Sequence, residues 1–395
     1  MIINDPSKCT GCMLCKEICP NDAIGQRTDS LGFIYPQRKT EKCNGCRLCE
    51  KECRNLPALK QKSKQHYYAV INKDQETVAG SASGGAFPAL AKEIIHQHGT
   101  VFGAGYDQSF AIKHFSIHDA SDIPKLQGTK YPQSSMIGLY EEIKTSLLEG
   151  REVLFVGTPC QCAAIKEYIK NSKTEDGNLY IADLFCNGVI SPKIWGEYIE
   201  FIEKRFGKTE QISFRDKKKG WRNKHMKVYA GGEDISDYCN NKASILRIYE
   251  MEICFRASCY QCPYKSMERV GDISIGDFWG IERVKLKLDR NTGVSALITN
   301  NDKGERLFER TKESFDYFSV KKEEILQPVL KGFTPIHPER ENFIHSYEEG
   351  QTEMILERYG KVKGFVKLKR DYIVPLLYTF QLAGIASKIL HHNDD

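Results

Sequence analysis

The chain has 395 residues, more than one typical domain, so we expect two or three domains. Hydrophobic residues make up 41% and charged residues 28%, which is ordinary for a soluble globular protein. The net charge of +5 is mild, and no Lys/Arg run is interleaved with aromatic residues, which argues against a nucleic-acid partner.

The two ends of the chain carry no membrane signal. Residues 1–6 have neither the basic nor the apolar region of a signal peptide. The apolar stretch 372–390 is interrupted by Pro375, Gln381 and Lys388 and falls short of the roughly 20 apolar residues of a spanning helix. We therefore expect a cytoplasmic protein without a transmembrane segment. The tail is expected to pack on the body, with peripheral association with a membrane surface or a partner protein as the alternative.

The 15 cysteines are many for a cytoplasmic chain. Reducing conditions disfavour disulfides, and an odd total argues against a complete disulfide framework. Clustered cysteines in such a chain indicate metal binding or redox chemistry.

Eight cysteines near the N-terminus form two copies of one pattern, with two residues between the first three cysteines and three before the fourth. In bacterial two-cluster ferredoxins, this pattern binds two four-iron clusters, and the fourth cysteine of each copy serves the other cluster. The predicted ligands are a first set, Cys9, Cys12, Cys15 and Cys53, and a second set, Cys43, Cys46, Cys49 and Cys19. Zinc is the weaker alternative, because structural zinc sites commonly use two separated Cys-x2-Cys pairs.

Residues 1–62 are thus predicted to be a two-cluster [4Fe-4S] ferredoxin domain. Residues 31–36 indicate a short hairpin strand, and the polar residues 56–65 indicate a linker. Such a module only accepts and donates single electrons, so we look for the site that it serves further along the chain.

Alternating strand and helix signals begin at Tyr67 and predict a mixed α/β body covered by helices. The expected strands are 67–72, 100–106, 153–156 and 179–184, and the expected helices are 86–98, 161–170 and 191–206. The predicted fold class is therefore α+β or α/β, with a ferredoxin-like dicluster domain before the body. We divide the remainder into the two parts of the body, 66–150 and 151–320, and a C-terminal helical tail, 321–395.

A further four cysteines are expected to meet at one edge of this sheet. Cys160 follows the strand 153–156 and Cys186 follows the next parallel strand, while Cys259 and Cys262 form a Cys-x2-Cys pair followed by proline. This body set could bind a third four-iron cluster, with Cys254 as the stand-in if one ligand is wrong and zinc as an alternative. We interpret Cys162 and Cys239 as ordinary buried thiols. The position of Cys160 near a helix N-terminus is expected to favour its thiolate.

Other features are less specific. Ser83-Gly84-Gly85 at a helix start could hold a phosphate or flavin ring, or could simply cap the loop. The basic loop 215–222 could hold an anionic substrate or be a solvated surface, and we weigh these evenly. The histidines show no ligand spacing and are interpreted as structural or surface residues.

Several short motifs together resemble the beta subunit of coenzyme F420-reducing hydrogenase and its dehydrogenase relatives, preceded by a two-cluster ferredoxin domain. The motifs are Ser83-Gly84-Gly85, Lys130-Tyr131 with Ser134, Gly157-Thr158-Pro159-Cys160-Gln161, Asp183 to Gly188, Phe214 to Lys217 with Gly220-Trp221, and Cys259 to Tyr264 leading into Asp272 to Gly280. The resemblance covers residues 67 to about 300. Asn187 stands where the family more usually has histidine.

The resemblance implies a flavin, FAD or FMN, a four-iron cluster in the body, and hydride exchange with a soluble hydride carrier. It places Ser83, Gly84, Gly85, Lys130, Tyr131 and Ser134 beside the flavin. The predicted function is an iron–sulfur flavoprotein oxidoreductase that couples hydride exchange to single-electron transfer with a redox partner protein, with catalytic residues unknown. The alternatives are an electron-transfer subunit whose catalytic centre lies on another chain, and a non-redox scaffold.

Overall fold

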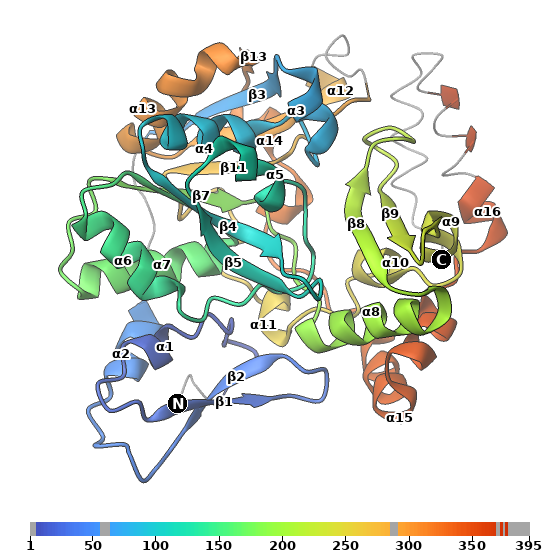
Figure 1. The fold of residues 1–395 in the computed structure, drawn as a ribbon, viewed down its shortest axis with the longest axis horizontal. Coiled ribbons are helices and arrows are strands. Elements are labelled where there is room, and N and C mark those ends of the chain that lie inside the picture. The colour runs from blue at the N-terminus through green and yellow to red at the C-terminus, as the bar shows by residue number, and fades with distance from the viewer. Residues whose placement is uncertain (1–4, 56–63, 285–290, 369–371, 374–375, 378–395) are drawn as a thin grey trace.

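The structure is a computed structural model that describes residues 5–55, 64–284 and 291–368, together with 372, 373, 376 and 377 (Figure 1). Most of the predicted linker and of the apolar stretch 372–390 lies outside these residues. Within the described ranges, no helix has the length and apolar character needed to cross a membrane.

The N-terminal module, residues 5–55, is a hairpin flanked by two cysteine-bearing helices. Its elements are α1 (Leu14–Glu17), β1 (Ile24–Thr28), β2 (Ile34–Arg38) and α2 (Leu48–Asn55). The hairpin strands are antiparallel, and the Asp29 carboxylate accepts a hydrogen bond from Phe33 N at 2.9 Å inside the turn. The strand expected at 31–36 therefore begins three residues later, because this turn occupies residues 29–33.

An eight-stranded mixed sheet forms the centre of the molecule (Figure 1). Its order is β13 (Phe315–Ser319), β3 (His66–Asn72), β12 (Ser295–Thr299), β11 (Ile273–Asp277), β7 (Leu179–Leu184), β6 (Val153–Gly157), β4 (Thr100–Tyr106) and β5 (Ile112–Ile117). The four strands β11, β7, β6 and β4 run parallel to their neighbours within this group, and the other pairings are antiparallel. The predicted mixed α/β body is thus confirmed.

Helices cover both faces of this sheet because its central strands are apolar on both sides. Along β6, Leu154 and Val156 pack against one set of helices, and Val153 and Phe155 pack against the other. The first face carries α4 (Ala86–His96), α5 (Ile123–Leu126) and α13 (Asp302–Thr311). The second carries α6 (Leu139–Leu148) and α7 (Pro159–Asn171). Shorter helices are α3 (Gln75–Gly80), α11 (Ala257–Tyr260), α12 (Ile281–Val284), α14 (Lys322–Ile325) and α16 (Gly364–Leu368).

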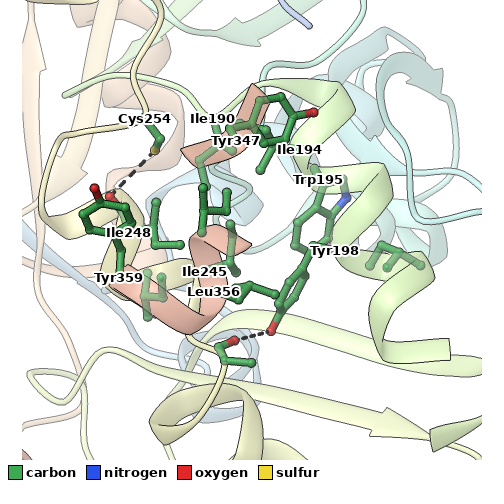
Figure 2. Packing of buried hydrophobic residues seen from close by; sticks show 14 of the residues in the cluster. Ile190, Ile194, Trp195, Tyr198, Ile245, Ile248, Cys254, Tyr347, Leu356 and Tyr359 are labelled. Carbon is green, nitrogen blue, oxygen red and sulfur yellow. Dashed lines mark hydrogen bonds between the residues drawn. The ribbon is translucent and has the colours of Figure 1, made fainter. Parts of the chain in front are cut away.

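A second hydrophobic core lies beside the sheet (Figure 2). It joins α8 (Pro192–Phe206), β8 (Thr209–Asp216), β9 (His225–Ala230), α9 (Ser236–Asn241), α10 (Ile245–Glu250) and α15 (Arg340–Tyr359), and the short exposed strand β10 (Glu233–Asp234) pairs with β9. Ser191 begins α8 as its N-cap, accepting hydrogen bonds from Lys193 N and Ile194 N at 3.1 and 3.3 Å. Figure 2 shows Cys254 inside this core, where its thiol faces the Ile248 carbonyl at 3.7 Å.

The N-terminal module shares this second core. Leu31, Phe33 and Tyr35 are at most 2% exposed and belong to the same cluster as Ile190 and Ile194. Burying three such side chains stabilises the joint by several kcal/mol, at roughly 1.5–3 kcal/mol each. The module is therefore packed onto the body, and its cysteines have a defined position relative to the sheet.

Candidate redox site

Two cysteines of the body set, Cys160 and Cys186, follow the ends of two parallel strands. β6 and β7 are adjacent and in register, with Gly157 opposite Asp183, so the loops that carry Cys160 and Cys186 leave the same edge. At the start of α7, the Gln161 side chain accepts hydrogen bonds from Thr158 N at 3.0 Å and Thr158 Oγ1 at 2.9 Å. This capping box fixes the turn on which Cys160 sits.

Cys259 lies on α11 and Cys262 on the loop after it. All four cysteines line one cavity. Burial raises the pKa of Cys186 well above its usual range, and the charges of Cys259, Cys160 and Cys262 raise it further. Such mutual influence requires the four sulfurs to lie close together.

The expectation that Cys160 favours its thiolate is wrong for the free side chain. Burial, followed by the neighbouring charge of Cys262, raises the pKa of Cys160 to about 11. Desolvation at this site therefore outweighs the helix N-terminus. A bound cation would reverse this balance, because a coordinating thiol is deprotonated outright.

The first set is gathered in the same way. Burial raises the pKa of Cys15, with further contributions from the charges of Cys12, Cys9 and Cys53. The pKa of Cys53 is raised to about 12 by burial and then by Cys12 and Cys9. Cys53 therefore lies near the first cysteine loop, and its role as a ligand of that set stays a prediction.

The second set lies further out. The pKa of Cys49 is raised by burial, and Cys19 and Cys46 are among the neighbouring charges that raise it further. Cys43 is half-buried on the loop that carries Cys46, and Cys46 is exposed. Among the described residues, no three His, Cys, Asp or Glu side chains converge closely enough to hold a single metal ion. The ligands of a four-iron cluster each bind a different iron atom, so they need not converge on one point.

The first set and the body set are neighbours. The pKa of Cys12 is raised to about 11 by burial, and the charges of Cys9 and of Cys160 both contribute. Tyr140 donates a hydrogen bond to the Cys12 carbonyl at 2.6 Å, and Gln133 Nε2 donates to the Thr10 carbonyl at 2.9 Å. These contacts dock the first cysteine loop on the edge of the sheet that carries the body set.

A cavity of about 290 Å³ extends from the body set along this edge. Five of the six residues expected beside a flavin line it, namely Ser83, Gly85, Lys130, Tyr131 and Ser134. Gly84 has a different role, because a Cβ there would lie 2.4 Å from the Val70 carbonyl and 2.6 Å from Ser295 N. Gly84 thus lets the loop approach two strands of the sheet.

The polar side chains of this group are held by the protein itself. Ser83 Oγ donates to the Val294 carbonyl at 2.7 Å, and Ser134 Oγ accepts from Gln161 Nε2 at 2.9 Å. Lys130 Nζ donates to the carbonyls of Leu126 and Gln127 at 2.9 and 2.8 Å. Burial lowers the pKa of Lys130 to about 7.

Two features of the cavity were missed by sequence reasoning. His114 lines the cavity; its Nε2 lies 3.1 Å from the Val156 carbonyl, and its ring stacks on Phe155. Burial lowers its pKa to about 4. Asp277 also lines the cavity. Its position after Gly276, within the motif Asp272 to Gly280, was the signal in the sequence that could have identified it.

The basic loop is only partly a solvated surface. Arg215 is buried and pairs with Asp277 at 2.8 Å, and Arg222 is buried and pairs with Glu282 at 2.8 Å. Lys218 is exposed. The solvated-surface interpretation is therefore wrong for the two arginines, which hold the loop against the sheet.

Asn187, which replaces the family's more usual histidine, joins two charged side chains. Its Oδ1 accepts a hydrogen bond from Lys265 Nζ at 3.0 Å, and its amide donates to the Glu252 carboxylate. Lys265 is 4% exposed and lies near the body set, where its charge lowers the pKa of Cys186. Asn187 therefore anchors a buried cation beside these cysteines.

Comparison with known proteins gives two family matches. Residues 150–324 match the family described as the C terminus of the beta subunit of coenzyme F420 hydrogenase/dehydrogenase, and residues 2–25 match the 4Fe-4S binding domain. No curated protein matches the chain. Among solved structures, a chain of the F420-reducing [NiFe] hydrogenase complex from Methanosarcina barkeri is similar at 17% identity and a TM-score of 0.46, over 76% of this chain and 92% of that one.

The two family matches confirm the resemblance drawn from the motifs and place the chain among iron–sulfur oxidoreductases. Residues 150–324 are thus similar to the C-terminal domain of the coenzyme F420 hydrogenase/dehydrogenase beta subunit, and they follow a region similar to the 4Fe-4S binding domain.

Proposed function

We propose that this protein is an iron–sulfur flavoprotein oxidoreductase that couples hydride exchange at a flavin to single-electron transfer through three four-iron clusters. The observation that carries the proposal is the order in which the three cysteine sets neighbour one another in space. The second set neighbours the first through Cys49 and Cys15, and the first neighbours the body set through Cys12 and Cys160. The body set opens onto the cavity. The assignment of each set to one cluster is part of the proposal.

The donor chemistry of the body set fits a four-iron cluster. Four half-buried thiols that raise one another's pKa values are unfavourable as free thiolates, and bound iron would relieve this cost. Cys254, the stand-in, is buried in the second core, and burial raises its pKa to about 12. We therefore keep Cys160, Cys186, Cys259 and Cys262 as the proposed ligands.

The cavity fits a flavin, FAD or FMN. Gly85, Ala86 and Phe87 line it at the start of α4, where the first backbone amides of a helix have no partner within the helix. Such amides suit a phosphate group, and the apolar remainder of the cavity suits a ring system. Its volume of about 290 Å³ lies at the lower end for ligand pockets.

When bound, the flavin would exchange the two electrons of a hydride with a soluble carrier, and the clusters would pass these electrons singly to or from a redox partner protein. The chain's own part is to position and to exclude water. The body set lines the cavity, and Lys130, whose pKa is lowered to about 7 by burial, lies at the cavity wall. Exposed Cys46 places the second set where a partner protein can reach it.

The test is anaerobic purification with iron, sulfide, zinc and flavin measured together. We expect about twelve iron atoms and one flavin per chain, since each cluster holds four. Dithionite should then bleach the absorption of both cofactors. A hydride donor should reduce an artificial viologen acceptor.

Three outcomes would contradict parts of the proposal. Zinc in place of iron would overturn it altogether. About eight iron atoms would remove the body cluster. Full iron without flavin, and without turnover of a hydride donor, would leave an electron-transfer subunit that serves a catalytic partner chain.

A further inference from the structure

Arg256 lies at the joint between the N-terminal module and the body. Its side chain is 1% exposed, and all three of its nitrogens are engaged. Nε donates to the Cys9 carbonyl at 2.8 Å and Nη1 to Gln133 Oε1 at 3.1 Å. Nη2 donates to the Ile34 carbonyl at 2.9 Å and lies 3.8 Å from Cys9 Sγ. One guanidinium thus holds the first cysteine loop, the hairpin and the body together.

The charge of Arg256 is compensated differently from that of other buried arginines. Arg215, Arg222 and Arg269 each form an ion pair with a carboxylate. Within the described residues, the hydrogen-bond acceptors of Arg256 are two backbone carbonyls, an amide and a sulfur. A buried cation without an anionic partner is costly, so an anion is expected nearby.

The cysteine sulfurs of both sets would supply that anion once they bind iron, because a coordinating thiol is deprotonated. The guanidinium contacts Cys9 Sγ of the first set, and Arg256 lines the same cavity as Cys160 and Cys259 of the body set. The guanidinium lies over the Tyr35 ring, 4.1 Å from the centroid, so this ring of the N-terminal module also helps to hold it in place. Gly11 leaves room for it, because a Cβ there would lie 2.7 Å from Nη1.

We propose that Arg256 is a positioning residue that holds the first set against the body set and places one positive charge between their two clusters. This inference rests on the proposed function for the presence of both clusters. A shared cation stabilises the added electron on either cluster, so it raises both reduction potentials. It also fixes the separation across which the electron passes.

The experiment compares the anaerobic full-length chain with Arg256→Gln, Arg256→Lys and Lys265→Gln. Lys265 lies beside the body set, and its contacts are with Asn187 and Thr334. The Lys265 variant therefore removes a charge from one cluster only. The midpoint potentials of the clusters are measured by titration with EPR detection, and amide hydrogen exchange is followed in residues 8–15.

We expect Arg256→Gln to shift the one-electron equilibria of two clusters about tenfold toward the oxidised form, about 59 mV each. Exchange in residues 8–15 should accelerate at least tenfold. Arg256→Lys keeps the positive charge but loses the several N–H donors of the guanidinium. Its cluster potentials should therefore lie close to those of the unmodified chain, while amide exchange in residues 8–15 stays fast. Lys265→Gln should shift one potential and leave exchange unchanged.

Unchanged potentials and exchange in Arg256→Gln would overturn the proposal, as would a shift confined to one cluster. If Arg256→Gln does not load its clusters, Arg256→Lys decides, and slow exchange of residues 8–15 in that variant would contradict the positioning role. Iron in the unmodified chain is measured first. A missing body cluster there refutes the proposed function, while the exchange results still test whether Arg256 holds the joint.

Discussion

At the scale of single residues, His114, which lines the cavity, makes the stability of the folded protein depend on pH. Its folded-state pKa of about 4 lies below the ordinary value of 6.5, so the folded protein disfavours the charged ring. Stability is therefore fully present above pH 6.5 and is lost as the pH falls toward 4. From pH 7 to pH 5 we expect a loss of about 2 kcal/mol from this residue.

Denaturant unfolding of the unmodified chain and of His114→Gln, followed at both pH values, measures this contribution. The variant should lose about 2 kcal/mol less than the unmodified chain over the interval. Equal losses in the two proteins would show that His114 is not buried in its neutral form.

The cysteines of the body set and the core cysteines should respond differently to the same substitution. Cys259→Ser removes one proposed ligand, so we expect iron to fall by about four atoms per chain. Cys254→Ser is the matched control, because Cys254 faces the Ile248 carbonyl, to which a serine hydroxyl can also donate. Iron loss in the Cys254 variant, with full iron in the Cys259 variant, would show that Cys254 is the ligand and Cys259 is not.

At the scale of elements, the turn before α4 depends on Gly84. A methyl group there would meet backbone atoms of β3 and β12, neither of which can yield as a flexible side chain can. We expect Gly84→Ala to lower the flavin content severalfold and to leave the iron content unchanged. Gly196→Ala in α8 has nothing within 4 Å and serves as the control. Normal flavin content in Gly84→Ala would mean that this turn does not shape the site.

The elements also show how far sequence reasoning reaches. β4 and β7 have the predicted bounds, because both are apolar runs ended by polar or turn residues. β1 was missed, since only Ile24 in it is buried and its pattern is mostly polar. The sequence placed Cys160 and Cys186 after two adjacent parallel strands, and β6 and β7 do pair in parallel. The contact of Arg256 with Cys9 joins residues 247 positions apart, and no local pattern signals such a pairing.

At the scale of the whole molecule, the two ends of the proposed electron route differ in what stabilises their fold. The eight-stranded sheet has a large apolar core on both faces. The N-terminal module has few buried apolar residues of its own, so its loops depend on bound iron and on the joint with α8.

Removal of iron and sulfide should therefore loosen the module selectively. We expect amide exchange of residues 5–55 to rise at least tenfold in the iron-free chain, while β6 and β7 keep their protection. Simultaneous loss of protection in the sheet would mean that the body, too, folds only around its cluster.

The exposure of Cys46 bears on the lifetime of the protein in air. Among the cysteines of the three sets Cys46 is exposed, whereas Cys9 is buried and the four cysteines of the body set are half-buried in the lining of the cavity. Oxygen reaches the outermost sulfurs first, so damage should advance inward from the surface. A preparation exposed to air should first lose electron transfer to the proposed partner protein, while hydride exchange at the proposed flavin continues. Its iron content should therefore fall before its flavin content does.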